Sequence, residues 1–142
     1  RNGYALDTFL VMGKGPGAHY RDMMALIESE LGAELESQAP LAPAGGGRVS
    51  RRVRHFPIPP AVDIRPDERG AYHSLNIVAS DRPGLLYRVA RQLADYKLSL
   101  YSAKINTLGD RAEDVFLVSG AVLTDAKAVL RLEQELLAEL QI

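Results

Sequence analysis

The stretch of this chain best suited to binding chemistry is a turn that follows an alternating apolar run, and it reads Asp81-Arg82-Pro83-Gly84-Leu85-Leu86. An ionised aspartate only accepts hydrogen bonds, so Asp81 suits an ammonium group or a side-chain amide. A helix that starts in such a turn leaves backbone N–H groups without partners, and these groups attract a carboxylate. The same spacing also fits an ordinary connection between a strand and a helix, so both interpretations stay open.

Two elements must hold this turn in place. Before it, Tyr72–Val78 predicts a strand, because apolar residues alternate there with polar ones. After it, apolar residues recur at helical spacing as far as Asp95. We expect Asp81 to cap this helix and Pro83 to occupy its first position, while Gly84 lets a backbone or a ligand come close.

The elements that follow predict an α+β fold. They are a strand at Leu98–Thr107, a turn at Leu108–Arg111, a strand at Ala112–Ser119 and a helix at Asp125–Leu140. The order strand, helix, strand, strand, helix is typical of helices packed on one face of a mainly antiparallel sheet. No fourth strand is recognisable before Ile142, so the sheet is expected to take one from Ala61–Ile64 or from Arg51–Phe56.

The N-terminal part of the chain predicts a second, shorter unit. Asn2-Gly3 favours a hairpin turn, and Tyr4–Met12 reads as a strand. The glycines of Gly13–Gly17 lack the ending of a phosphate-binding loop, so this segment is interpreted as a plain loop. Arg21–Leu35 predicts a helix whose two methionines fill a core, and Ser37–Ser50 predicts a flexible linker.

The two parts of the chain repeat each other. Leu6–Val11 matches Glu113–Val118, and the helical stretch Ile27–Leu35 matches Leu132–Leu140 in the same order. The first repeat lacks half of its core, which must come from missing residues, from the second unit or from another chain. The predicted organisation is the C-terminal half (strand, helix) of a first repeat at 1–36, a linker at 37–50, edge strands and a connection at 51–70, and a second repeat at 71–142.

Composition excludes several classes of function. With 142 residues and 46% hydrophobic content, the chain can bury a core. A net charge of -1, spread evenly, argues against binding to nucleic acid or to a membrane surface. The chain has no cysteine, no apolar run long enough to span a membrane and no signal peptide, which fits a cytoplasmic protein. It opens on Arg1 instead of Met, so we expect a piece of something longer. His19, His55 and His73 lie apart, without the spacing of metal ligands.

Taken together, these residues resemble an ACT domain. The resemblance rests on the turn, on Gly109 and Arg111, and on the runs Ser102-Ala103-Lys104-Ile105-Asn106-Thr107 and Asp114-Val115-Phe116. The tandem arrangement resembles the C-terminal end of the bacterial bifunctional PII uridylyltransferase/uridylyl-removing enzymes. Within that end, Gly3–Phe9 resembles part of the first repeat and Arg51–Pro59 the segment between repeats. The regulatory ACT region of another enzyme is the alternative.

The resemblance implies a ferredoxin-like βαββαβ fold that senses glutamine or another small amino acid. For the whole enzyme it implies nitrogen regulation through PII protein, to which uridylyl groups are attached when glutamine is low and from which they are removed when it is high. The nucleotidyltransferase and hydrolase domains, and the Mg²⁺ that they use, would lie N-terminal to this chain. The chain itself is expected to be catalytically silent, with no catalytic residue, metal ligand or cofactor.

Carried over by position, the resemblance implies an effector site at the turn, formed by Asp81, Arg82, Pro83, Gly84, Leu85 and Leu86. The backbone N–H groups of Gly84, Leu85 and Leu86 would face the carboxylate of the ligand. In pairs of ACT domains, a neighbouring unit's second strand usually forms the other wall, which here adds Ala103 and Asn106. Asp7 and Asp114 are interpreted as residues that set strand geometry.

A module that forms a dimer without binding any ligand is the competing interpretation. It would pair through exposed sheet edges, with Tyr101 and Lys104 as contacts. A homodimer is compatible with the sensor as well. The sequence therefore predicts an α+β, ferredoxin-like regulatory module and leaves its effector and its oligomeric state open.

Overall fold

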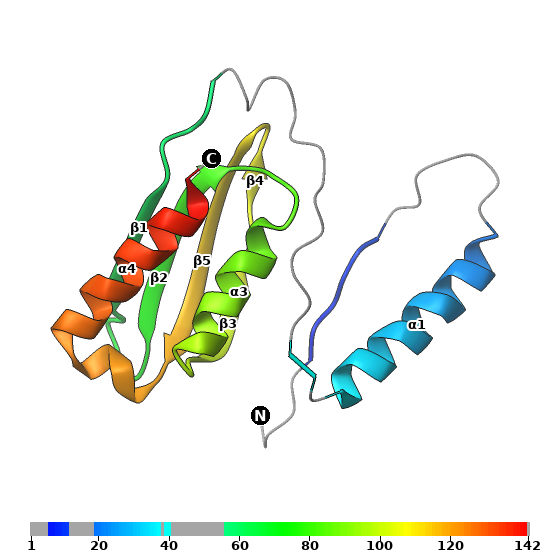
Figure 1. The fold of residues 1–142 in the computed structure, drawn as a ribbon, viewed down its shortest axis with the longest axis horizontal. Helices are drawn as coiled ribbons and strands as arrows, with labels where there is room; N and C mark the ends of the chain where they lie inside the picture. The colour runs from blue at the N-terminus through cyan, green and yellow to red at the C-terminus, as the bar shows by residue number, and fades with distance from the viewer. Residues whose placement is uncertain (1–5, 12–18, 38, 41–55, 142) are drawn as a thin grey trace. The chain divides into compact units, whose positions relative to one another are not determined.

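The computed structural model describes residues 6–11, 19–37, 39–40 and 56–141 (Figure 1). The chain divides into two units, Arg1–Pro40 and Leu41–Ile142, which are treated separately here. The predictions for Asn2-Gly3 and Gly13–Gly17 lie outside the described residues. So do those for most of the 37–50 linker and for residues 51–55.

The first unit contains one helix, α1 (Tyr20–Glu36), which confirms the helix predicted at Arg21–Leu35. None of its residues is buried, and the side chain of Leu35 is 78% exposed. The prediction that the two methionines fill a core is therefore wrong for this structure. A single amphipathic helix cannot enclose an apolar core without a second layer against it.

The strand predicted at Tyr4–Met12 is also wrong over the part that is described. Residues 6–11 pair with no other strand among the described residues. Leu6 and Leu10 are almost fully exposed. A lone extended segment has no ladder of hydrogen bonds to hold it, so the repeat pattern alone does not make this segment a strand.

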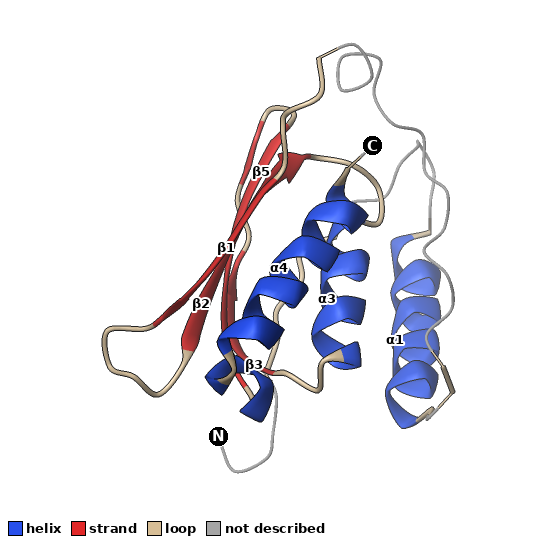
Figure 2. Ribbon diagram, turned by 60° about the vertical axis from the view of Figure 1, so that its left-hand side comes forward, coloured by secondary structure: helices blue, strands red, loops and turns tan. Residues whose placement is uncertain are grey.

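The second unit is built on an antiparallel sheet with the strand order β1-β2-β5-β3 (Figures 1 and 2). Its strands are β1 (Ala61–Pro66), β2 (His73–Ser80), β3 (Ser99–Lys104), the short β4 (Thr107–Leu108) and β5 (Arg111–Ser119). β4 lies off this path and pairs with β5, closing a tight hairpin. This hairpin confirms the turn predicted at Leu108–Arg111.

The helices α3 (Leu85–Asp95) and α4 (Ala126–Leu140) cover one face of this sheet (Figure 2). A 3₁₀ turn, η1 (Ala121–Thr124), leads into α4, whose first turn is capped by Asp125 accepting the N–H of Lys127 at 2.9 Å. Alternate residues of β2 and β5 point at the helices because side chains on a strand alternate between its faces. The central core residues are Leu75, Ile77, Val89, Val118, Leu132 and Leu136. The predicted α+β, ferredoxin-like architecture is confirmed.

β1 provides the fourth strand of the sheet. It lies antiparallel to β2, with Ala61 opposite Val78 and Pro66 opposite His73. The free edge of β1 is partly covered, because the N–H of Ile64 donates to Oε1 of Glu133 on α4 at 2.8 Å. Of the two stretches predicted to complete the sheet, the one that includes Ala61–Ile64 does so.

The strand predicted at Leu98–Thr107 is confirmed by β3 but is not continuous, because β3 ends at Lys104 and β4 starts only at Thr107. Between them the backbone of Asn106 leaves the β3 pairing. Its N–H donates to Oδ1 of Asp114 at 3.1 Å, and its carbonyl accepts the N–H of Glu113 at 2.8 Å. A buried side chain thus takes a hydrogen bond that a neighbouring strand would otherwise make, and this interrupts the strand.

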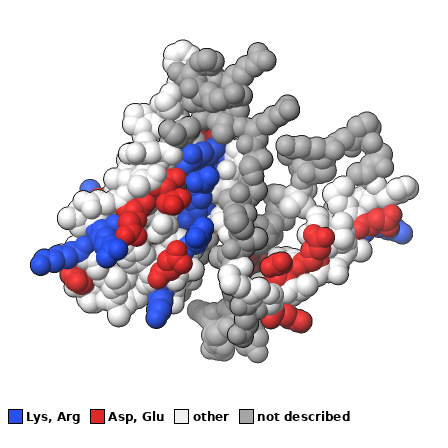
Figure 3. Space-filling view, in the orientation of Figure 1, with Lys and Arg blue, Asp and Glu red and all other residues white. Residues whose placement is uncertain are grey.

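Charged side chains of both signs lie close together over the helical layer (Figure 3). They include the pairs Arg88–Glu139, Arg91–Asp95 and Arg131–Glu135. In this view the helical layer of the second unit therefore carries mixed charge. Among the residues that the structure describes, no helix has the length and apolar character needed to cross a bilayer.

Candidate functional site

The turn between β2 and α3 is a type II turn spanning Arg82–Leu85. The N–H of Leu85 donates to the carbonyl of Arg82 at 3.2 Å, Pro83 occupies the second position, and Gly84 has φ 80° and ψ 7°. A φ of this sign suits glycine, which has no Cβ to clash with the backbone. The sequence Arg-Pro-Gly-Leu thus specifies the turn by local chemistry alone.

The helix consequently begins later than predicted. α3 starts at Leu85, and the residue flanking its start is Gly84, without any side chain that caps it. The predictions that Asp81 caps this helix and that Pro83 is its first residue are wrong, because the turn comes between them and the helix. The backbone of Asp81 is held instead by its N–H, which donates to the carbonyl of Asp110 at 2.8 Å. Its carboxylate is free of the capping role.

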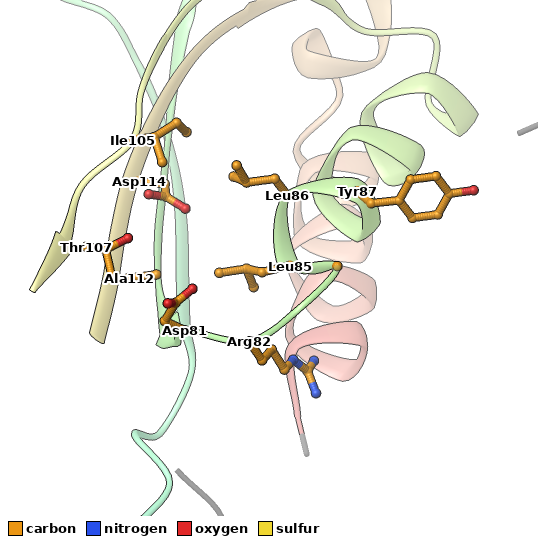
Figure 4. Close-up of a pocket in the computed structure, with 10 residues that line it drawn as sticks. Asp81, Arg82, Leu85, Leu86, Tyr87, Ile105, Thr107, Ala112 and Asp114 are labelled. Carbon is orange, nitrogen blue, oxygen red and sulfur yellow. The ribbon is translucent and has the colours of Figure 1, made fainter. Parts of the chain in front are cut away.

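A pocket of about 330 Å³ opens beside this turn (Figure 4). This volume lies at the lower end of the range typical of small-molecule sites. The turn and α3 contribute one side of the pocket, and the strands with the β3–β4 connection contribute the other. The lining residues are Asp81, Arg82, Gly84, Leu85, Leu86 and Tyr87 on the first side, and Ile105, Thr107, Ala112 and Asp114 on the second.

The backbone donors at the helix start differ in part from the prediction. The N–H of Leu85 is already used by the carbonyl of Arg82. Within the described chain, the N–H groups of Gly84 and Leu86 find no acceptor. Both residues line the pocket, so two of the three predicted donors remain for a ligand carboxylate.

Asp114 is one of the site residues that the sequence interpretation missed. Its side chain is only 2% exposed, and while Oδ1 accepts the N–H of Asn106, Oδ2 has no hydrogen-bond partner among the described residues. Burial raises the pKa of this carboxyl above its usual range, against the opposing effect of the Asn106 hydrogen bond, and the negative charge of Asp81 adds to the rise. Asp114 does set strand geometry, but it also faces the pocket. Its signal was an acidic residue in the buried register of a strand, alternating with Ala112 and Phe116.

The side chain of Arg82 makes contacts that the sequence did not predict, although Arg82 is among the residues that line the pocket. In Figure 4 it points away from the pocket, and its guanidinium donates to the carbonyl oxygens of Glu139 at 2.6 Å and of Gln141 at 3.3 Å. Burial and the nearby Arg88 lower the pKa of Arg82, and the charge of Glu139 opposes this. The Glu139 carbonyl lies in the last turn of α4 and the Gln141 carbonyl just after it, where neither has a helical partner. Arg82 therefore connects the turn to the end of α4.

Three predicted site residues, Pro83, Ala103 and Asn106, are not among those that line the pocket. Ile105 and Thr107 line the pocket instead, and they lie where the chain is interrupted between β3 and β4. Asn106 affects the pocket only indirectly, because its backbone N–H donates to the carboxylate of Asp114. A wall contributed by a neighbouring unit stays a prediction.

The arrangement suits binding of a small polar molecule with an apolar stem. Two carboxylates and the Thr107 hydroxyl supply acceptors, and the side chains of Leu85, Leu86 and Ile105 supply apolar surface. The described residues hold no group of three or more His, Cys, Asp or Glu that could bind a metal ion.

Curated relatives match the chain over its whole length. It is 53% identical to the bifunctional uridylyltransferase/uridylyl-removing enzyme of Cupriavidus pinatubonensis, and 52% identical to the enzymes of that name from Cupriavidus metallidurans and Ralstonia nicotianae. All of this chain is covered in each case, but only 17% of each relative. No family model and no solved structure matches the chain. Identity of this level over the full chain shows that it belongs to the family of bifunctional uridylyltransferase/uridylyl-removing enzymes.

Proposed function

We propose that this chain is an ACT-type regulatory module that binds glutamine in the pocket beside the turn that joins β2 to α3. The observation that supports the proposal most is that hydrogen-bond donors and acceptors lie on opposite sides of that pocket. The N–H groups of Gly84 and Leu86, which find no acceptor among the described residues, lie on one side, and the carboxylate of Asp114 lies on the other. Glutamine carries a carboxylate for these N–H groups, and its ammonium and side-chain amide groups bring N–H donors for the carboxylates of the pocket.

Asp81 is the acceptor we assign to the ammonium group. It is exposed at the mouth of the pocket, next to the same turn that carries the free N–H groups. The carboxylate and ammonium groups of an amino acid sit on one carbon atom, so their partners in the protein must also be close neighbours. Gly84, Leu86 and Asp81 meet this requirement because they belong to one short turn and the helix that follows it.

For the longer protein, we propose the activity named in its relatives, with PII protein as the substrate. This chain corresponds to 17% of each of those enzymes, so transfer and removal of uridylyl groups, and any Mg²⁺ they require, would belong to other parts. Glutamine bound at the turn would then shift the balance between the two reactions in the cytoplasm.

A dimerisation module is the second candidate function, and one observation favours it. β3 is an edge strand of the sheet whose residues are all exposed, with Leu100 53% and Tyr101 67% exposed. An unprotected apolar edge is a template for strand pairing. Sedimentation of the chain would test this candidate, and Tyr101→Lys should weaken any dimer formed through β3.

Thermal unfolding of the chain with and without glutamine tests the proposed sensor. Ligand at a hundred times its dissociation constant adds about 2.7 kcal/mol to the free energy of unfolding, which a small domain shows as a clear rise in Tm. We expect the rise with glutamine, a loss of it in Asp81→Ala, and no loss in the control Asp95→Ala, whose side chain is exposed on α3. If no amino acid raises Tm in the unaltered chain, the sensor proposal is wrong.

A further inference from the structure

The least satisfied polar group that faces the pocket is Oδ2 of Asp114. It lies on a side chain that is 2% exposed, and it accepts no hydrogen bond from the described residues. A buried carboxylate oxygen without a donor is unfavourable, and native structures rarely keep one without a reason. A donor brought by a ligand would be such a reason.

The direction of Oδ2 is fixed by the other oxygen of the same group. Oδ1 accepts the backbone N–H of Asn106 at 3.1 Å, which limits rotation of the carboxylate. Figure 4 shows Asp114 on the strand side of the pocket, facing Leu86 at the start of α3. Oδ2 therefore presents a preorganised acceptor to whatever fills the space between them.

No cationic side chain of the described residues neutralises this acceptor within the pocket. Arg82 lines the pocket, but its guanidinium is engaged by the carbonyl oxygens at the end of α4. The groups that face Asp114 are Asp81 from the turn, Thr107 from β4 and apolar side chains from α3. The polar groups that face Asp114 in the pocket are thus hydrogen-bond acceptors, and the charge they carry is negative.

We propose that Asp114 determines which amino acid the pocket accepts, by receiving an N–H of a neutral side-chain amide and by repelling a side-chain carboxylate. This inference rests on the proposed function, since it assigns a role within the same site. An amide of glutamine has two N–H donors to offer, whereas the carboxylate of glutamate has none and carries a negative charge. The pocket would therefore separate two ligands of nearly the same size by what it excludes as well as by what it binds.

Substitution by asparagine isolates this role. In Asp114→Asn the side-chain oxygen can still accept the N–H of Asn106, so the strand geometry should persist. The atom that faces the pocket becomes an NH₂ group, which donates instead of accepting. The substitution should then weaken glutamine binding and strengthen glutamate binding, whereas a merely structural defect would weaken both together.

The experiment is calorimetric titration of the full 142-residue chain with glutamine and with glutamate, at one pH and one salt concentration. For the unaltered chain we expect the dissociation constant of glutamate to exceed that of glutamine by at least about tenfold, because one polar contact in a site can supply such discrimination. For Asp114→Asn we expect this ratio to fall to about one or to reverse. The control Asp63→Asn, an exposed pair partner of Arg65 on β1, should keep the preference of the unaltered chain.

The outcomes separate the inference from the proposal on which it rests. If the unaltered chain binds no amino acid, the proposed function fails and the inference fails with it. If it binds glutamine and glutamate equally, or if Asp114→Asn keeps the preference within about twofold, the inference alone is overturned. A titration with MgCl₂ alone completes the test, because tight Mg²⁺ binding lost in Asp114→Asn would assign the carboxylates to a cation and overturn the amide role.

Discussion

Replacing Arg82 with alanine should destabilise the second unit, although Arg82 lies in a solvent-accessible turn. Its guanidinium donates to the carbonyl of Glu139 in the last turn of α4 and to that of Gln141 just after the helix. These carbonyls have no helical partner, and the positive charge also interacts favourably with the C-terminal end of the helix dipole. Arg82→Ala removes both contributions at once and frees the turn from α4.

The expected loss follows from the geometry of these two hydrogen bonds. The bond to Glu139 is short at 2.6 Å, and the bond to Gln141 is long at 3.3 Å, so we count them as little more than one strong interaction. A hydrogen bond from a charged group contributes about 1.5–3 kcal/mol when buried, and partial exposure reduces it, which gives a loss of about 2 kcal/mol. For a unit of this size, that loss lowers Tm by roughly 8–16 °C.

Urea unfolding measures this change, provided that the free energy of unfolding depends equally steeply on urea concentration in both variants. The control is Arg91→Ala, whose contact with Asp95 is long at 4.0 Å and joins two exposed side chains, so it should cost less than about 0.5 kcal/mol. Arg82→Lys should recover part of the stability, because it restores the charge but not the forked donor geometry. If Arg82→Ala costs no more than Arg91→Ala, the fastening of the turn to α4 contributes nothing, and the argument is refuted.

Three further changes test other parts of the structure. Gly84→Ala should cost about 1–2 kcal/mol in urea unfolding because of its left-handed φ, whereas Gly32→Ala, in the open interior of α1, should stabilise its helix by about 0.5–1 kcal/mol. Equal effects of the two would contradict the type II turn. Glu133→Ala should cost about 1–2 kcal/mol by leaving the N–H of Ile64 unpaired, and Glu133→Gln, which keeps an acceptor, should cost less. Burial raises the pKa of Asp114, so its contribution to stability is full below the unfolded pKa of about 3.9 and is lost as the pH rises through the folded value. Asp114→Asn should therefore gain stability relative to the unaltered chain between pH 4 and pH 7, and a constant difference over that range would count against the raised pKa.

Local patterns were sufficient to predict most of the second unit. The alternation in β2 and β5 and the helical spacing in α3 and α4 are set by which side chains must be buried, and burial is visible as periodicity. The turn at Asp81–Leu86 was predicted because proline fixes its own φ and glycine permits a positive φ, so the two together specify a turn locally. The turn residues other than Pro83 line the pocket, but an effector site at this turn was expected from the family resemblance and not from these residues alone.

The features that were not predicted depend on contacts between distant parts of the chain. Arg82 lies far along the sequence from Glu139, and no local pattern shows that a guanidinium will reach those carbonyls instead of a ligand. The interruption at Asn106 is likewise decided by the side chain of Asp114 on another strand. In α1, periodicity correctly predicted a helix but could not predict what covers its apolar side, because covering requires a second element.

The position of β1 directly before β2 in the sequence also affects how this unit folds. β1 and β2 are neighbours in sequence and in the sheet, joined by a turn in which the N–H of Asp67 donates to the carbonyl of Tyr72 at 2.8 Å. Pairing between neighbours loses little loop-closure entropy, so we expect this two-stranded ribbon to form early and to present β2 as a template for β5. A fourth strand placed after α4 would instead have to find its edge last. Glu133 of α4 then stabilises a strand that is already in place, so docking of the final helix locks the sheet and does not build it.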